Sequence, residues 1–432
     1  MWNIAYNILI SVAALFLVPY YLLKMLLTGK YRKSIGPKFG FIPSGVFDAM
    51  EGRPRIWVHA VSVGEVTAAA PVISSLREEL PDACIVLSTS TETGQEMARG
   101  MVTDATTVFY YPLDIPPVIR RVMDRVRPDI FVPVETEVWP NFIRLCRKRG
   151  IMVAMVNGRI SPRSFRKYRL TRFFWQDIFN MIDKIGAISP IDEVRLKDLG
   201  VYASKVHLMG NAKYDGLAAK SSPSLRDEIG AVLNIPAGSS VLVAGSTHGG
   251  EEEVVLDVYR RLRDSYPELL LIIVPRHIER TEEVQTLIRS KGFAPAITMT
   301  EIMKGRERRS EPIIVIDVIG ELFKVYSLAT VVFCGGSLVP KGGQNILEAA
   351  AWGKVVLYGP SMEDFSQEKE ALERVGAGIT VTNADAFLRD MDMLMAHPDI
   401  LRDRGEAGRQ MVRANMGASR RYAGLIMSLL EE

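Results

Sequence analysis

Cysteine is scarce in this sequence, and neither sign of charge is in large excess. The three cysteines, Cys84, Cys146 and Cys334, lie in apolar or helical stretches and lack the spacing of metal ligands. They indicate neither a disulfide framework nor a zinc site, and are typical of reduced core residues in a cytosolic compartment. The formal net charge of +3 in 432 residues is too small to indicate a nucleic-acid partner.

Two common motifs of phosphate and metal chemistry are also missing. No Gly-Lys-Ser/Thr sequence follows a predicted strand, which excludes a P-loop. No Asp-X-Asp sequence stands at a predicted strand end, so the chain does not require a divalent metal. We therefore expect neither a bound metal nor a cofactor.

Charged side chains are absent from residues 2–23, which are strongly apolar and have aromatic residues toward both ends. About 20 such residues can span a bilayer, so we expect a single membrane anchor over residues 1–29. The basic residues that follow place the body of the protein on the cytoplasmic face. A cleaved signal peptide would need a basic start and a small-residue cleavage site, and both are missing. A helix lying in the membrane interface stays open, because Asn3, Asn7 and Ser11 share one face.

Past residue 50, short apolar runs alternate with helical patterns, and the alternation starts again after a polar stretch. This rhythm predicts α/β structure with parallel sheets, and the length exceeds one ordinary core. We predict two Rossmann-like domains facing a cleft, over residues 30–217 and 227–432, with a linker at 218–226. The expected strands are 56–61, 84–88, 107–111, 130–134, 152–156, 184–188, 206–209, 240–244, 269–274, 313–316, 331–334 and 355–357.

Glu65 is the most informative single residue. It follows the apolar run 56–61 and the turn at Gly64, on the first turn of a predicted helix. Ligands of open α/β sheets bind at this place, outside the carboxyl ends of the strands. The alternative is an acidic residue that only complements the helix dipole, a contribution of about 0.3–1 kcal/mol.

Further charged residues follow other strands of the first half. Glu135 and Glu137 come directly after the run 130–134, and Lys213 ends the last strand of this half. Two carboxylates at a strand end suggest a site, although Glu137 as a helix cap and Glu135 as a solvated residue remain an alternative. Lys213 can meet a phosphate or a carboxylate, or can be an ordinary lysine between domains.

A basic, aromatic-rich helix is predicted over residues 163–175. Such a helix suits an anionic membrane surface or a phosphorylated lipid. A core helix with a solvated basic face explains the pattern equally well. The basic residues that we expect to face the membrane or acceptor are Arg163, Arg166, Lys167 and Arg169.

The second half places glycine-rich turns and charges at strand ends. The turn 245–253 opens a helix, and free N–H groups there would bind an anion. Arg276 can hold a phosphate bidentately, and Glu348, one turn into a helix after a glycine-rich loop, can accept hydrogen bonds from ribose hydroxyls. A lone glycine-rich loop is weak evidence, but this combination predicts a nucleotide-type site.

Seven motifs in order narrow the prediction: HAVSVGE, ETEVWPN, GSTHGGEE, VPRHIER, GELFKVY, GGSLV and GGQNILEAA. Together they closely resemble the 3-deoxy-D-manno-octulosonic acid (Kdo) transferases of Gram-negative bacteria over nearly the whole chain. The resemblance implies a GT-B type fold and inverting transfer of Kdo from CMP-Kdo to a hydroxyl of the lipid A precursor (lipid IVA) in lipopolysaccharide biosynthesis. It also implies a location at the cell inner membrane.

The same resemblance implies roles for individual residues. Glu65 matches the catalytic base, and Glu135 and Lys213 match positions that stabilise the transition state. Ile346 departs from the family pattern, in which proline is common. The segments that match CMP-binding positions are Pro275-Arg276, Gly320-Glu321-Leu322 and Asn345-Ile346-Leu347-Glu348.

Two other readings compete. Another GT-B enzyme, using a UDP-sugar, or a nucleotide-sugar epimerase would share much of this pattern. A membrane-tethered binding protein with an inactive site would fit if Glu65 or Arg276 were missing, and both are present.

Overall fold

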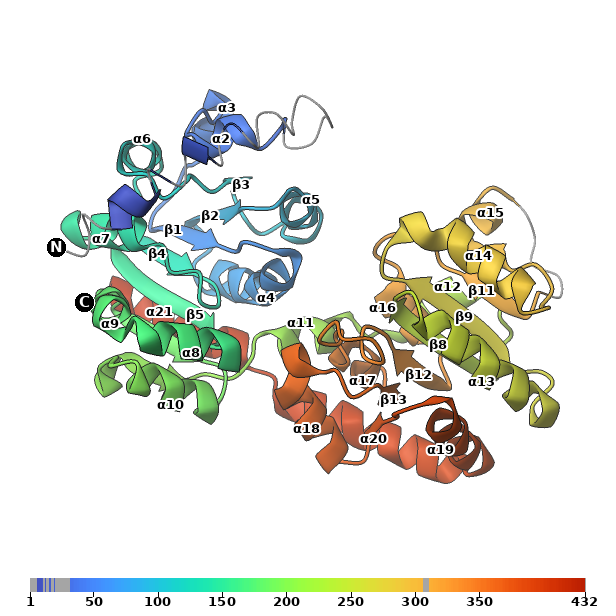
Figure 1. Ribbon diagram of the computed structural model, residues 1–432. Helices are drawn as coiled ribbons and strands as arrows, with labels where there is room; N and C mark the ends of the chain where they lie inside the picture. Colours follow the sequence, from blue (N-terminus) through green and yellow to red (C-terminus); the bar gives the residue numbers. More distant parts are fainter. Residues whose placement is uncertain are drawn as a thin grey trace. The chain divides into compact units, whose positions relative to one another are not determined.

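The computed structural model describes residues 6–10, 12, 15–16, 19, 32–305 and 311–431. The chain divides into two compact units (Figure 1). The first is Met1–Gly216 together with Asn415–Glu432, and the second is Leu217–Ala414. Within the described residues each unit is built on one seven-stranded parallel sheet.

The first sheet has the order β3-β2-β1-β4-β5-β6-β7. Its strands are β1 (Arg55–His59), β2 (Cys84–Thr89), β3 (Thr107–Tyr110), β4 (Ile130–Pro133), β5 (Met152–Gly158), β6 (Lys184–Ala187) and β7 (Val206–Leu208). The helices of this part of the chain are α2 (Ile35–Lys38), α3 (Ser44–Asp48), α4 (Val63–Glu79), α5 (Glu92–Met101), α6 (Pro116–Val126), α7 (Pro140–Lys148), α8 (Pro162–Leu170), α9 (Arg172–Phe179), α10 (Pro190–Asp198), α11 (Lys213–Lys220) and α21 (Ala418–Leu430).

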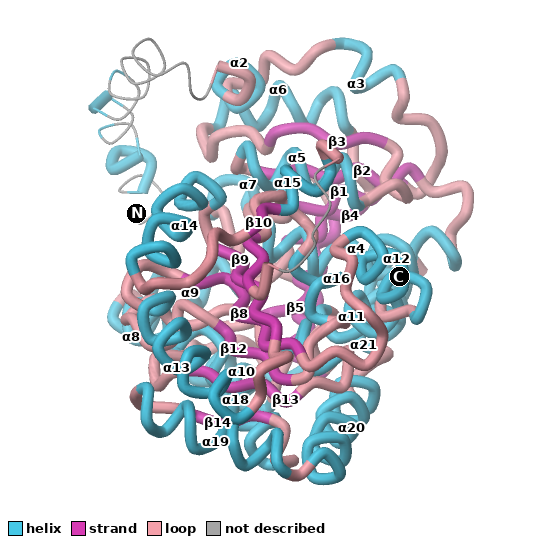
Figure 2. The backbone as a smooth tube through the Cα atoms, turned by 90° about the vertical axis from the view of Figure 1, so that its right-hand side faces the viewer, coloured by secondary structure: helices cyan, strands magenta, loops and turns pink. Residues whose placement is uncertain are grey.

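The second sheet has the order β10-β11-β9-β8-β12-β13-β14. Figure 2 labels β10, β9, β8, β12, β13 and β14 of this sheet from top to bottom. Its strands are β8 (Val241–Thr247), β9 (Leu270–Pro275), β10 (Ile297–Thr298), β11 (Ile313–Val315), β12 (Val331–Cys334), β13 (Val355–Tyr358) and β14 (Gly378–Thr380). Its helices are α12 (Pro223–Val232), α13 (Glu251–Ser265), α14 (Thr281–Ser290), α15 (Met299–Met303), α16 (Leu322–Tyr326), α17 (Leu347–Ala351), α18 (Ser366–Arg374), α19 (Ala384–Ala396) and α20 (Pro398–Ala414).

Every apolar run chosen from the sequence forms a strand, because parallel strands buried on both faces are continuously apolar. The sequence analysis missed β10 and β14, which are edge strands of two and three residues. Strands this short carry too few residues for a recognisable apolar run. The three cysteines are buried and free.

Successive side chains of β1 enter different cores, as the pleat of a strand requires. Ile56 and Val58 pack with apolar residues of α4, while Trp57 packs on the opposite face with Phe131 and Phe142. Burial on both faces therefore holds β1 in register inside its sheet, where it pairs with β2 and β4.

The predicted domain boundaries differ from the observed units at the C-terminus. We expected residues 227–432 to form the second domain, but Asn415–Glu432 belongs to the first unit. Helix α21 lies against α4 and β5 there, because Tyr422, Leu425 and Ile426 complete the core behind β1. The expected linker 218–226 is occupied by the end of α11 and the start of α12.

Most of the predicted membrane anchor, residues 1–29, lies outside the described residues. Among the residues that the structure does describe, no helix is both long enough and apolar enough to cross a membrane. Two described residues near the N-terminus contact the first unit. The Tyr6 hydroxyl donates to Asp114 at 2.8 Å, and the Asn141 side-chain amide donates to Asn7 at 2.7 Å.

Candidate active-site residues

The first sheet reverses its strand order between β1 and β4. From β1 the chain proceeds through β2 to β3 on one side, and β4 then begins the other side. Loops after two such strands diverge, and ligands of open α/β sheets bind in the space that this leaves. Glu65 follows β1, and Glu135 and Glu137 follow β4, so the three carboxylates occupy the two loops at this switch point.

Glu65 is held on the first turn of α4 by hydrogen bonds from the loop before it. Its carboxylate accepts from the Val61 backbone N–H at 2.7 Å and from the Ser62 hydroxyl at 2.9 Å. Only 8% of the residue is exposed. Burial and then the negative charge of Glu137 raise the pKa of Glu65 to about 8, with a smaller contribution from Glu135 and against the opposing bonds from Val61 and Ser62. A carboxyl that titrates near neutral pH suits general-base catalysis.

Glu135 is paired with the other predicted catalytic residue of this unit. Lys213, at the start of α11, lies 2.7 Å from the Glu135 carboxylate, and both side chains are about four-fifths buried. The alternative in which Glu135 is merely a solvated residue is therefore wrong. Glu135 has φ of +57°, a conformation that non-glycine residues rarely adopt and that is common where a structure holds a functional loop.

A buried asparagine joins the loops that carry these residues. Asn157, at the end of β5, also has positive φ, and its side-chain oxygen accepts from the Ala212 N–H at 2.9 Å. Asn211 accepts from the Lys213 N–H at 3.0 Å. These bonds orient the start of α11 so that the lysine reaches back to Glu135.

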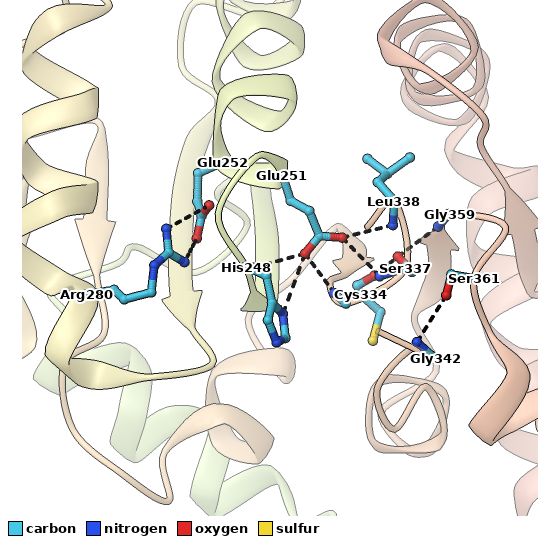
Figure 3. A network of polar contacts seen from close by, with 11 residues as sticks. His248, Glu251, Glu252, Arg280, Cys334, Ser337, Leu338, Gly342, Gly359 and Ser361 are labelled. Carbon is cyan, nitrogen blue, oxygen red and sulfur yellow. Dashed lines mark hydrogen bonds and ion pairs between the residues drawn. The ribbon is translucent and has the colours of Figure 1, made fainter. Parts of the chain in front are cut away.

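In the second unit the strand order reverses between β8 and β12. A buried carboxylate organises the two loops there (Figure 3). Glu251, on the first turn of α13, accepts from the backbone N–H groups of His248, Gly336, Ser337 and Leu338 at 2.9, 2.7, 3.0 and 2.9 Å. Free amides were expected in the turn 245–253, and for His248 this expectation is wrong, because its N–H binds the protein's own carboxylate.

The predicted nucleotide-binding segments all follow strands at the carboxyl edge of this sheet. Arg276 follows β9 and is exposed, and its backbone N–H donates to Thr247 at 2.9 Å. Gly320, after β11, has φ of +95°, which glycine adopts without strain. Glu321 then precedes α16, and its carboxylate lies 3.1 Å from Lys324.

The segment from Asn345 to Glu348 starts α17. The Asn345 side chain accepts from the Leu347 N–H at 3.2 Å and donates to the Glu348 carboxylate at 3.0 Å. Ile346 stands at the position where the family pattern commonly has proline, and it is fully buried. Its side chain therefore supports the turn before α17 by packing. This segment follows β12 and Glu321 follows β11, and the strands β9 and β8 lie between these two in the sheet.

Comparisons with known proteins identify the family. A family model described as 3-deoxy-D-manno-octulosonic-acid transferase (kdotransferase) matches residues 33–216. The 3-deoxy-D-manno-octulosonic acid transferase of Haemophilus influenzae is 31% identical over 433 residues, covering 100% of this chain and 99% of that protein. The chain belongs to the Kdo transferase family.

Solved structures show how widely the fold of this Kdo transferase family member is shared. UDP-GlcNAc 2-epimerase from Neisseria meningitidis is similar with a TM-score of 0.60 at 12% identity, covering 88% of this chain and 100% of that one. A glycosyltransferase from Rickettsia africae gives a TM-score of 0.57 at 14% identity, covering 87% and 97%. The α/β fold is GT-B-like, and at such identities these likenesses concern the fold alone.

The basic segment of this family member forms two short helices, α8 and α9, with a break at Thr171. Its aromatic residues Phe165, Tyr168, Phe174 and Trp175 pack against the core of the first unit. The predicted basic residues Arg163, Arg166, Lys167 and Arg169 are all exposed. The segment therefore has an exposed basic face and an aromatic side that packs against the core. This arrangement is compatible with both interpretations of the sequence, a helix that contacts an anionic membrane or lipid and a core helix with a solvated basic face.

Sequence reasoning assigned no role to three acidic residues of this Kdo transferase family member. Glu137 received no individual role beyond the alternative of a helix cap, yet α7 begins with no hydrogen bond from a capping side chain. Asp114 performs that function from another loop, since it accepts from the N–H groups of Asn141 and Phe142 at 3.0 and 2.9 Å. Glu251 was one of three consecutive glutamates. Only tertiary contacts distinguish these residues from ordinary acidic ones.

Proposed function

We propose that this protein transfers Kdo from CMP-Kdo to a hydroxyl of the lipid A precursor lipid IVA in lipopolysaccharide core biosynthesis. The relationship to the Haemophilus influenzae Kdo transferase over the whole chain carries this proposal. Similarity of that extent covers the residues of both units that the reaction would use.

In the proposed reaction Glu65 takes the proton from an acceptor hydroxyl. The resulting oxygen bonds to the anomeric carbon of Kdo through an oxocarbenium-like state. The bond from that carbon to the phosphate oxygen breaks, and CMP leaves with the electron pair. An inverting transfer needs such a base on the face opposite the leaving group. The position of Glu65 at the sheet's switch point, with a carboxyl that titrates near neutral pH, supports this role.

Charge stabilisation is the second requirement. The donor carries a phosphate and a carboxylate, and negative charge grows on CMP as the bond breaks. Lys213 and Arg276 neutralise these groups in the proposal, with Glu135 orienting Lys213 through their 2.7 Å ion pair. Glu321 and Glu348 bind the nucleotide, and the reaction requires no metal.

The acceptor would be presented at the inner membrane. We propose that residues 1–29 attach the chain to the cytoplasmic face of that membrane, because residues 2–23 contain no charged side chain. Helix α8 would contact the acceptor's phosphates. Its exposed basic residues lie next to Leu170 and Phe173, which are 82% and 51% exposed and suit the apolar side of a membrane interface.

Mass spectrometry tests the proposed reaction. The detergent-purified protein is incubated with lipid IVA and with CMP-Kdo generated in situ, and the molecular mass of the lipid product is measured. We expect a gain of whole Kdo units, whose number gives the stoichiometry. A lipid of unchanged mass, from protein that CMP still protects against thermal unfolding, would mean that the acceptor or the sugar is assigned wrongly.

A further inference from the structure

Two arginines follow β9, and their surroundings differ. Arg276 is exposed, and within the described part of the chain its side chain forms no ion pair or hydrogen bond. Arg280 ends the single helical turn Ile278–Arg280, and its side chain is only 20% exposed. Arg276 is therefore available to a ligand, whereas the guanidinium of Arg280 already has partners within the protein.

Arg280 binds two carboxylates at once. Its guanidinium donates to Glu252 at 2.7 and 3.4 Å and to Glu283 at 2.8 and 3.2 Å. The side chain of Glu252 is fully buried, whereas that of Glu283 is 65% exposed. A buried carboxylate needs a cation and hydrogen bonds in good geometry to offset the loss of water. The bonds to Glu252 therefore constrain the position of Arg280 most strongly.

Glu252 lies beside Glu251 on the first turn of α13, and the two carboxylates point in opposite directions (Figure 3). Side chains of successive helical residues diverge because a turn contains about 3.6 residues. Glu251 accepts from N–H groups of the loop after β12, whereas Glu252 accepts from Arg280 in the loop after β9. The sheet order is β9-β8-β12, so one helical turn after β8 fixes the loops that follow both neighbouring strands.

Further contacts join the loop after β8 to the loop after β9. The Arg276 backbone N–H donates to the Thr247 carbonyl at 2.9 Å. The rings of His248 and His277 pack edge to face, with their centroids 6.0 Å apart. The backbone of Arg276 is thus held by Thr247 on one side and, through Arg280, by α13 on the other.

We propose that Arg280 is a positioning residue for the donor's phosphate, because its bonds to Glu252 fix the loop from which Arg276 reaches that phosphate. This inference rests on the proposed role of Arg276 in donor binding. Arg280 does not contact the donor itself, since its N–H groups bind two carboxylates. A guanidinium suits this task because its rigid fork of donors can bind two carboxylates at once, whereas a lysine ammonium is a point charge on a flexible stem.

The first test replaces the fork and keeps the charge. In Arg280→Lys the buried Glu252 retains a counter-ion, but the loop after β9 loses its fixed geometry. We expect the Kd of CMP, measured by isothermal titration calorimetry on the full chain in detergent, to rise about tenfold. KM for CMP-Kdo should rise with it, and KM for the lipid acceptor should not change.

A double-mutant cycle distinguishes positioning from a general structural effect. Arg276→Ala removes the side chain that Arg280 positions. In the Arg276→Ala protein, Arg280→Lys should therefore change the Kd of CMP by less than about twofold. A tenfold effect of Arg280→Lys in both backgrounds would overturn the proposal, and so would an unchanged Kd in Arg280→Lys alone.

A matched control is the ion pair that joins the same two helices at another place. Asp257 of α13 lies 2.7 Å from Lys291, directly after α14. Glu252→Gln and Asp257→Asn each convert one carboxylate of α13 into an amide, and thermal unfolding without nucleotide measures their structural effects. Glu252→Gln should weaken CMP binding as Arg280→Lys does, whereas Asp257→Asn should not. Equal weakening by both would show that the packing of α13 on α14 matters and would contradict the role of Arg280.

Titration of the parent protein with UDP separates this proposal from the proposed function. Binding of UDP but not of CMP would contradict the proposed donor, and the same cycle measured with UDP would still decide the role of Arg280. Binding of neither nucleotide would contradict both proposals.

Discussion

At the scale of single residues, Glu65 combines burial, two short hydrogen bonds and neighbouring negative charge. Glu65→Gln retains the shape but cannot take a proton. We expect kcat to fall about 10²- to 10⁴-fold, the usual contribution of a general base, with CMP binding unchanged because the nucleotide-binding segments are in the other unit. Steady-state kinetics and CMP titration measure the two effects. Near-normal turnover would remove Glu65 from the role of base.

Glu251 is a structural counterpart of Glu65 in the second unit. It too lies on the first turn of a helix after a central strand, but its carboxylate is fully buried and satisfies four backbone N–H groups. Glu251→Ala leaves those donors without an acceptor and should lower the free energy of unfolding by at least about 2 kcal/mol. Denaturant unfolding, with the exposed Asp264→Ala in the same helix as control, measures the loss. Equal stability of the two variants would contradict this role.

At the scale of elements, the proposed contact of helix α8 with the lipid acceptor predicts an effect on the acceptor alone. Replacing Arg166, Lys167 and Arg169 by glutamine should raise KM for the lipid acceptor about 100-fold, since each of the three basic residues near an anionic surface contributes about 1 kcal/mol and about 1.4 kcal/mol corresponds to tenfold. KM for CMP-Kdo should not change. A matched triple replacement of the exposed residues Lys304, Arg402 and Arg413 in the second unit serves as control. Equal effects on both substrates would argue against docking by α8.

Helix α21 makes contacts with other elements that its own sequence does not reveal. Its apolar residues are evident from the chain, but the core that they join is formed with α4 and β1, which are distant in the sequence. Asp215 accepts from the Gly417 and Ser419 N–H groups at 2.5 and 2.6 Å, and Tyr422 donates to the Gly210 carbonyl at 2.8 Å. The C-terminal helix thereby supports the same segment that presents Lys213.

At the scale of the whole molecule, one fold serves both glycosyltransferases and UDP-GlcNAc 2-epimerases. Fold alone therefore does not choose the nucleotide. The proposed donor predicts that CMP raises the melting temperature, with about 2.7 kcal/mol of stabilisation at 100 times its Kd, and that UDP at equal concentration does not. Arg276→Ala should reduce the shift by CMP. Protection by UDP but not by CMP would favour the UDP-sugar alternative.

The sequence by itself determined the α/β class, the family resemblance and the strands other than the short edge strands β10 and β14, because buried parallel strands and glycine-rich turns are local patterns. It also placed Glu65, Glu135, Lys213 and the nucleotide-binding segments at strand ends. Only the tertiary structure decided that Glu135 pairs with Lys213, that Glu251 occupies the amides of a distant loop, and that α21 joins the first unit. Each of these depends on which strands become neighbours, and neighbours in a sheet can be far apart in the chain.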